Sequence, residues 1–335
     1  MDSIRIALEA YRIEALKIDR ITDKLYAVYD GKQVFALKRS KMTTEQIKNW
    51  EAVYHRAYSQ NLTGILSVYL TADGKLFKEV DGEFYYITPW LLQKKENQKQ
   101  EFEVLYKTIG AIHENTKQPV SNNIEKVRDQ FKQYQAYCTN IKSRLLSYVE
   151  TFEKNRYMSP FELLVCSQFR DLDLFLNELN RRIDYFMDEL NEQSDWNISL
   201  CHKQLNTSHV LQSDTIYITN WEGAQFDNAV VDLSIYLKNQ VKYYDQPAEQ
   251  IIDSFPVYLE KNKLTNSELY LLCIYLFDPS TYIRIIKRYT GKISTYSMLQ
   301  QIRELQHAYR QLIFAMKWSE HVDEFTVSSI DNLES

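Results

Sequence analysis

Three polar residues in the segment 200–222 are spaced as in a site that activates a hydroxyl group and holds Mg²⁺: Gln204, His209 and Asn220. Phosphoryl transfer uses a carboxylate near the acceptor hydroxyl, an amide oxygen five residues later, and a second carboxylate that bridges Mg²⁺ to the phosphates. In this sequence an amide, an imidazole and a second amide stand at those places. The segment has the layout of a phosphotransferase loop without its acidic groups.

These substitutions remove both the base and the metal ligands. The amide of Gln204 is not basic near neutral pH, and loss of a general base typically costs about 10²–10⁴ in rate. His209 offers nitrogen where Mg²⁺ prefers oxygen, and Asn220 offers a carbonyl without charge. Glu222 and Asp214 are nearby carboxylates that could build an atypical metal site. We expect no intact catalytic residue and no metal site at the three positions themselves.

Two further residues near the loop are interpreted as structural. His202 precedes the loop and is expected to hold it by packing and hydrogen bonding. A zinc site formed with His209 is disfavoured, because no third ligand has convincing spacing. Asp232 follows at the start of a predicted helix, where it either braces the loop or caps the helix.

A strand and the helix after it could supply a cation and a carboxylate for nucleotide binding. Residues 34, 36 and 38 share one strand face, and a lysine that follows a small residue on such a strand can reach the phosphates of a nucleotide. On the next helix, Glu51 follows Trp50 on the apolar side, where a carboxylate needs a cation. We predict a Lys38–Glu51 pair as a vestigial nucleotide clamp. A carboxylate at the solvent edge of that helix is the alternative.

A glycine-rich phosphate loop is missing from the expected place. The stretch 19–24, between the first two predicted strands, contains no glycine that would let backbone amides approach phosphates. Asp19 and Asp23 would repel phosphates, and Arg20 and Lys24 only partly offset them. We therefore predict that the chain binds no cofactor. ATP and Mg²⁺ are expected only under the alternative in which Glu222 or Asp214 forms an atypical metal site.

The hydrophobic pattern changes near residue 89. Before it, β-prone runs surround Asp-Gly turns, and one helix begins at a capping box of Thr43 and Gln46. After the Thr88-Pro89-Trp90 segment, apolar residues recur at helical spacing, with short strands around the loop 200–223. We predict an α+β protein in which residues 1–89 form a small, antiparallel β-rich lobe and residues 90–335 a large, mainly helical lobe.

The composition narrows the classes of partner. The 335 residues are 44% hydrophobic and 25% charged, with a net charge of −5, which disfavours nucleic-acid binding. The four cysteines form no Cys-x-x-Cys pair, so reduced thiols are expected. The longest apolar stretch, around 269–277, is too short to span a bilayer of roughly 30 Å. Early charges also disfavour a secretory signal.

The motifs occur in a recognisable order along nearly the whole chain. They are Lys38, Glu51, the segment 88–90, the segment 109–113, the His202 loop, the segment 218–222 and the segment 231–233. This order resembles the aminoglycoside and choline phosphotransferase superfamily and, within it, the bacterial endospore-coat kinase-like proteins of the CotS and YutH type. Where that family has Gly, Asp and Asn in its loop, this chain has Lys203, Gln204 and His209. Asn220 replaces the metal aspartate of the second motif.

The resemblance implies a bilobal protein-kinase-like fold, the Lys38–Glu51 pair and a structural His202. It also implies synthesis in the mother-cell cytoplasm, deposition at the endospore coat and other coat proteins as partners. Our leading interpretation is a catalytically defective kinase-like protein that serves as a structural or interaction component of the coat. The alternative is an active small-molecule phosphotransferase with an atypical metal site. A third interpretation is a nucleotide-independent binder of an unknown small molecule.

Overall fold

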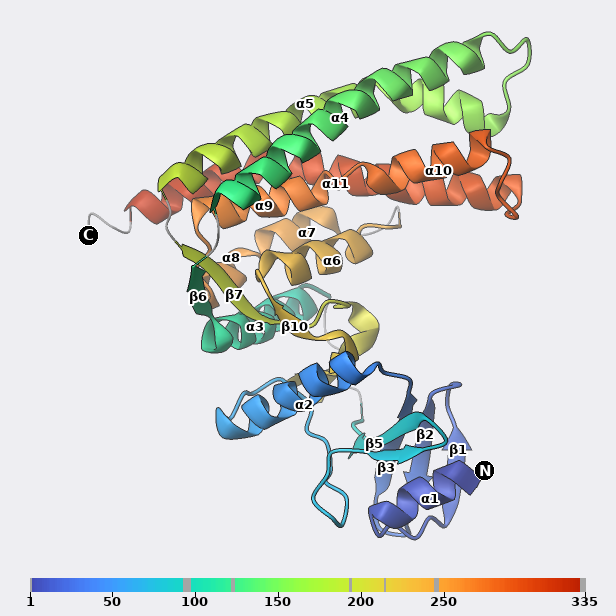
Figure 1. Cartoon of the computed structure of the whole chain (residues 1–335), viewed down its shortest axis with the longest axis vertical. Helices are drawn as coiled ribbons and strands as arrows, with labels where there is room; N and C mark the ends of the chain where they lie inside the picture. The colour runs from blue at the N-terminus through green and yellow to red at the C-terminus, as the bar shows by residue number, and fades with distance from the viewer. Residues whose placement is uncertain are drawn as a thin grey trace. The chain divides into compact units, whose positions relative to one another are not determined.

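The computed structural model describes residues 2–92, 98–121, 124–192, 195–213, 215–243 and 247–331. The chain forms two compact units (Figure 1). Unit 1 contains Met1–Thr116 and Leu200–Phe226, and unit 2 contains Lys117–Ser199 and Asp227–Ser335. The sequence places a boundary between residues 89 and 90, whereas unit 1 also includes helix α3 (Gln98–Thr116). The loop that carries Gln204 and Asn220 belongs to the same unit as Lys38.

Unit 1 is built on an antiparallel five-stranded sheet. Its order is β1 (Lys17–Arg20), β2 (Leu25–Tyr29), β3 (Val34–Ser40), β5 (Glu83–Pro89) and β4 (Lys78–Val80). The β2–β3 hairpin turns at the predicted Asp-Gly pair, where the Asp30 carboxylate accepts hydrogen bonds from two backbone amides and Gly31 has φ 94°. This hairpin brings Lys38 opposite Leu25, and β5 places Tyr86 on its other side.

Two helices pack against this sheet. Helix α1 (Asp2–Ala10) buries Ala7 and Leu8 in a core with strand residues such as Val28 and Leu37. Helix α2 (Thr44–Ser59) begins at the predicted capping box, which satisfies backbone amides at its first turn. It buries Trp50, Val53 and Tyr54.

In the rest of unit 1, the segment 200–222 contacts the residues that follow α2, at Gly64 and Ile65. Strands β8 (Val210–Gln212) and β9 (Ile216–Ile218) form an antiparallel pair between the 3₁₀ turns η1 (Thr207–His209) and η2 (Trp221–Gly223). Residues 65–70 form no named strand, and Ile65 makes a single isolated bridge with Ile218. At this junction the Gly64 carbonyl accepts a hydrogen bond from the Ile218 amide at 2.6 Å. Gly64 has φ 92°, and a Cβ there would lie 2.4 Å from Thr108, so only glycine fits.

Unit 2 is mainly helical, as predicted for the second part of the chain. Strand β6 (Gln118–Ser121) pairs with β7 (Asp195–Cys201). Long helices α4 (Ile124–Glu153) and α5 (Pro160–Glu192) form an antiparallel hairpin that is visible in Figure 1. The remaining elements are β10 (Gln225–Asp227), α6 (Val230–Gln240), α7 (Ala248–Asp253), α8 (Pro256–Lys261), α9 (Asn266–Leu276), α10 (Ser280–Thr290) and α11 (Met298–Asp331).

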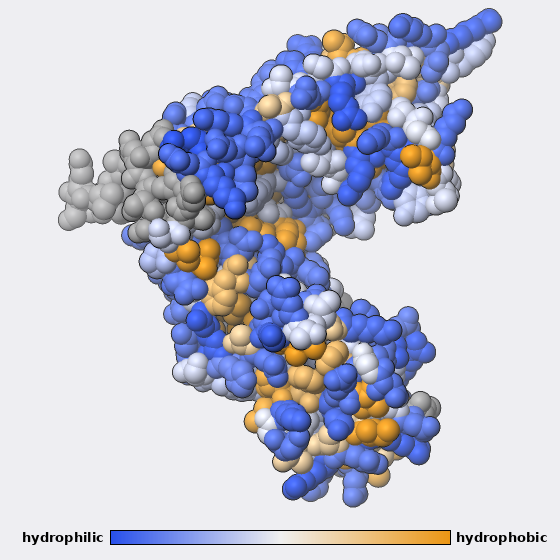
Figure 2. All heavy atoms as spheres, in the orientation of Figure 1, coloured by the Kyte–Doolittle hydropathy of each residue, from blue (hydrophilic) through white to orange (hydrophobic). Residues whose placement is uncertain are grey.

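One segment is apolar enough to pass a test for membrane spans. It is Asn266–Thr290, whose qualifying 18-residue window is 67% buried, and it consists of the two helices α9 and α10 rather than one. Core helices of folded proteins pass the same test, so this weak signal is consistent with the expected absence of a span. In the view of Figure 2, hydrophilic residues cover most of the visible surface and hydrophobic residues gather in small patches.

Candidate ligand-binding pocket

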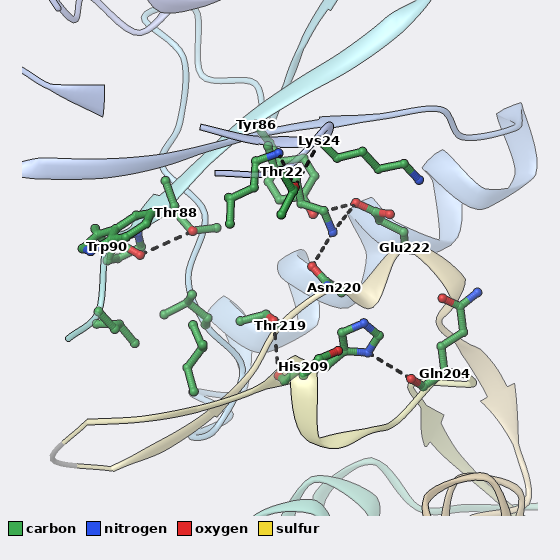
Figure 3. Close-up of a pocket in the computed structure, with 18 of the residues that line it drawn as sticks. Thr22, Lys24, Tyr86, Thr88, Trp90, Gln204, His209, Thr219, Asn220 and Glu222 are labelled. Atoms are coloured by element: carbon green, nitrogen blue, oxygen red, sulfur yellow. Dashed lines mark hydrogen bonds and ion pairs between the residues drawn. The ribbon is translucent and has the colours of Figure 1, made fainter. Parts of the chain in front are cut away.

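Unit 1 contains a cavity of about 550 Å³ in which most of the predicted site residues meet. Its walls come from the β1–β2 turn, β3, α2, the end of β5 and the segment 204–222 (Figure 3). Small-molecule sites typically have volumes of about 300–1,000 Å³. The cavity is therefore large enough for a ligand and is not filled by the protein's own side chains.

The two ends of the pocket differ in chemistry. One end is formed by the segment after β5, with Thr88 and Trp90, and the other holds Gln204, Asn220 and Glu222 (Figure 3). Four aliphatic residues also line the cavity: Leu25, Ala36, Leu66 and Leu211. Ala36 and Lys38 reach the pocket from the same face of β3, as the strand alternation predicts.

Lys38 is held by three neighbours at the polar end. Its Nζ lies 3.0 Å from Glu222 Oε1 and also donates a hydrogen bond to Asn220 Oδ1 (Figure 3). The Tyr86 hydroxyl donates to the same Glu222 oxygen at 2.7 Å, and its ring centroid lies 5.8 Å from the ammonium group. The side chains of Lys38 and Glu222 are only 16% and 21% exposed. The lysine and the carboxylate therefore satisfy each other inside the pocket wall.

The surroundings keep this pair charged. Burial lowers the pKa of Lys38, while Glu222 favours its charged form and partly offsets that effect. Burial would raise the pKa of Glu222, but Lys38, Tyr86 and Ser40 stabilise the carboxylate and bring its pKa below the ordinary value. Burial and the Glu222 charge raise the pKa of Tyr86 well above its usual value. Tyr86 is therefore a protonated donor to an ionised Glu222.

Glu51 does not have the predicted role within the described residues, where no ion pair joins it to Lys38. On α2 the positions that face the sheet are Trp50 and Tyr54, and Tyr54 lines the pocket. Glu51 lies about 100° around the helix from Trp50 and is partly exposed. It thus corresponds to the alternative of a carboxylate at the edge of the apolar face. Glu222, from the opposite wall, takes the place beside Lys38.

The loop contains two residues with left-handed backbone. Lys203, which stands where the family that the sequence resembles has glycine, has φ 66°, and Asn220 has φ 67° with ψ 43°. Left-handed backbone is costly for a lysine and more easily adopted by asparagine. The left-handed turn at Asn220 follows β9 directly, so its side chain reaches Lys38 from the end of that strand.

His202 is buried beneath the loop. Its Nε2 donates to the Thr219 carbonyl at 2.7 Å, its Nδ1 accepts from the Gln204 amide at 3.2 Å, and its ring packs on Trp221 with centroids 5.0 Å apart. Both ring nitrogens are therefore used to connect the loop to the end of β9. This arrangement leaves no nitrogen for a ligand.

His209 is presented to the pocket as a neutral imidazole. Its Nδ1 lies 2.9 Å from the Gln204 carbonyl and 3.3 Å from the Asn206 side-chain amide nitrogen. The shorter contact has Nδ1 as the donor, and in this tautomer Nε2 carries the lone pair. Burial and then the nearby His202 lower its pKa to about 4. The exposed side chain of Gln204 lines the same end, where it packs against Gly223. Neither residue brings charge to the pocket at neutral pH.

The groups present do not fit Mg²⁺ bound to a nucleotide. Mg²⁺ needs oxygen ligands in near-octahedral geometry. The Asn220 oxygen and the Glu222 carboxylate both contact the Lys38 ammonium, so an internal cation takes the place that an external one would need. His209 adds nitrogen, and Gln204 adds no charge. The charge of Lys38 is in turn compensated by Glu222 and not by a ligand phosphate.

Two residues named from the sequence lie elsewhere. Asp232 is buried in the first turn of α6, in unit 2. The Asn228 side chain accepts the Val230 amide of that turn at 3.1 Å. The role of Asp232, as a brace for the loop or as a cap, stays a prediction. Asp214, the other carboxylate considered for a metal, lies outside the described residues. Sequence reasoning missed Tyr86, whose position opposite Lys38 depends on the β3–β5 register.

The fold has clear relatives among solved structures, although no protein-family model and no curated protein matches the sequence. An aminoglycoside phosphotransferase from Alicyclobacillus acidocaldarius superposes with a TM-score of 0.73 at 16% identity, covering 97% of this chain and 96% of the other. A spectinomycin phosphotransferase solved with ADP and spectinomycin gives 0.58 at 13% identity, covering 94% and 97%. A microcompartment-associated aminopropanol kinase gives 0.57 at 13% identity, covering 95% and 97%.

These similarities define the fold. The chain has the α+β, protein-kinase-like fold of the aminoglycoside phosphotransferases, with an antiparallel sheet in its N-terminal part and mostly helices in its C-terminal part.

Proposed function

We propose that this chain is a kinase-fold protein that does not transfer phosphate and that acts by binding, as an interaction component of the bacterial endospore coat. The contact of Lys38 with both Asn220 and Glu222 carries the first part of this proposal. The Lys38 ammonium, which could bind a phosphate, instead contacts the Glu222 and Asn220 oxygens, which could bind a metal. Gln204 offers no base for an acceptor hydroxyl.

The loss of activity is tested by direct assay of the purified chain. ATP hydrolysis and phosphoryl transfer to hydroxyl acceptors are measured with Mg²⁺ and with Mn²⁺, beside a Lys38→Ala variant. We expect the two proteins to give the same background rate, because base and metal contributions are both missing. Clear turnover by the natural chain that disappears in Lys38→Ala would contradict the proposal.

A working small-molecule phosphotransferase is the second candidate. The observation that favours it is the open cavity of about 550 Å³ with a carboxylate, Glu222, at its polar end. In that case Glu222 would have to leave Lys38 and bind the metal. The same assay separates the candidates, because turnover would then depend on divalent metal and be lost in Glu222→Ala.

The spore-coat part of the proposal rests on the sequence resemblance. That resemblance implies synthesis in the mother-cell cytoplasm, deposition at the coat, and other coat proteins as partners. Immunodetection in fractionated spores of the producing bacterium tests it. We expect the chain in the coat extract and in the mother cell during sporulation. Its presence in growing cells, and its absence from the coat fraction, would contradict this assignment.

A further inference from the structure

The pocket combines a volume that suits a ligand with an internal ion pair, and this combination limits what can bind there. Glu222 contacts Lys38, the residue whose strand position suits a phosphate contact. A ligand phosphate at this place would meet the Glu222 carboxylate as well as the ammonium group. Displacing Glu222 would also break its hydrogen bond from Tyr86. The chain thus carries its own anion at the phosphate position.

We infer that Glu222 serves as an internal substitute for a ligand phosphate, so that the pocket binds an uncharged nucleoside-like molecule without metal and rejects its phosphorylated forms. This inference rests on the proposed binding function and names the class of ligand for the same pocket. Such a ligand differs from that of a working kinase, which binds a charged nucleotide together with a metal ion.

The charges of the other pocket residues also favour an uncharged ligand over a phosphorylated one. Lys24 is exposed at the pocket rim and is a second cation there. Lys38 and Glu222 cancel, and His209 is neutral because its pKa lies near 4. The pocket groups therefore offer about one positive charge, which is too little to compensate a triphosphate in the absence of metal.

The neutral polar groups fit hydroxyls and ring nitrogens. His209 presents the lone pair of Nε2, since its Nδ1 donates to the Gln204 carbonyl. Asn220 accepts from Lys38 through its oxygen, which leaves its NH₂ group as a donor. Aliphatic lining residues such as Ala36 and Leu211, together with Trp90 at the other end of the pocket, can cover the faces of a flat ring. A flat heteroaromatic ring that carries an uncharged hydroxylated group matches both ends.

Calorimetric titration in EDTA tests this selection. The probes are adenosine, guanosine, cytidine and uridine, each with its monophosphate and triphosphate. We expect at least one nucleoside to bind, and to bind about tenfold or more tightly than its triphosphate. Tighter binding of the triphosphate, or no binding of any nucleoside, would overturn the inference. Absence of nucleoside binding would leave the proposed lack of phosphoryl transfer intact, because turnover is measured separately.

Removing the internal anion provides the decisive variant. In Glu222→Gln the Lys38 ammonium loses its counter-charge, so triphosphate affinity should rise by about tenfold or more. The gain should vanish in the double variant Lys38→Met/Glu222→Gln. An unchanged triphosphate affinity in folded Glu222→Gln would overturn the inference.

Glu83→Gln is the matched control for this variant. Glu83 is also a carboxylate of unit 1 between two cations, Arg39 and Lys41, but it does not line the pocket. We expect its triphosphate affinity to equal that of the natural chain. An equal gain in this control would mean that net charge, not the position of Glu222, sets the selection, and would overturn the inference as well.

Discussion

Each unit contains a cation bound to carboxylates, and the two clusters differ in what surrounds them. In unit 2 the Arg182 side chain is fully buried and bonds to Glu178 at 2.8 Å, Asp323 at 2.7 Å and the Ser319 carbonyl at 2.7 Å. In unit 1 the Lys38 ammonium is bound by Glu222 and Asn220 on the wall of a cavity.

The contrast suggests different roles for the two clusters, folding stability for the Arg182 cluster and ligand binding for the Lys38 cluster. Arginine has several donors in a rigid fork, and the Arg182 cluster uses them within packed helices. Lysine is a compact charge on a flexible chain, and at Lys38 its partners face a space that a ligand can enter. The first cluster should therefore control folding stability, and the second should control which ligands bind. The following changes test that division.

Arg182→Met should have the largest effect on stability. It leaves Glu178, whose side chain is 13% exposed, without its buried partner, and breaking such a pair typically costs about 3–5 kcal/mol. Chemical denaturation measures the loss. Arg181→Met is the matched control, because Arg181 contacts the same Glu178 at 2.7 Å but is 50% exposed, so about 0–1 kcal/mol is expected. Equal losses in both variants would refute the assignment of stability to the buried arginine.

Lys38→Met should cost less, about 1–2 kcal/mol, because Glu222 is left unpaired but remains partly accessible to water. The same denaturation experiment measures it. A loss as large as that of Arg182→Met would show that the pocket pair is a structural element like the buried cluster.

Acid should weaken the structural cluster through Glu178. Burial raises the pKa of this group, but hydrogen bonds from Arg181 and Ser319 and the charge of Arg182 bring the pKa below its ordinary value. A carboxylate with a lowered folded-state pKa stabilises the protein above its unfolded pKa, and this contribution is lost as pH falls through the folded value. Between pH 6 and pH 3, Glu178→Gln should therefore lose less stability than the natural chain. Parallel pH profiles would contradict this expectation.

The smallest change concerns the turn beside the pocket. Lys203 has φ 66°, which costs a non-glycine residue about 1–2 kcal/mol, whereas glycine adds an entropic cost of roughly 0.5–1 kcal/mol. Lys203→Gly should thus raise the free energy of unfolding by about 0.5–1 kcal/mol, and Lys203→Ala, which keeps the Cβ, should not. A destabilised glycine variant would show that contacts of the lysine side chain outweigh the strain.

Local patterns were sufficient to predict much of the fold. The capping box at Thr43, the Asp-Gly turn after Asp30 and the short strands around the loop are all present. These features depend on residues close together in the sequence. The position of Lys38 in the pocket follows from the same local alternation of β3.

The partner of Lys38 could not be found in this way. Glu51 and Tyr54 differ by only about 60° around α2, so a small rotation decides which one faces the strand. Glu222 lies far along the sequence, and it reaches Lys38 only because β9 is fixed to the Gly64 region by the Ile65–Ile218 bridge. Long-range geometry of this kind leaves no periodic signal in the sequence.

The metal dependence of ATP binding tests the central claim, that Lys38 takes the place of a metal, most directly. The melting temperature of the natural chain is measured with ATP in excess Mg²⁺ and with ATP in EDTA. Ligand that binds only the folded state raises its stability by about 2.7 kcal/mol at a hundred times its Kd. The account predicts the same melting temperature, within about 1 °C, in both conditions, because the Asn220 and Glu222 oxygens are held by an ammonium group. A rise of about 5 °C or more that requires Mg²⁺ would contradict it.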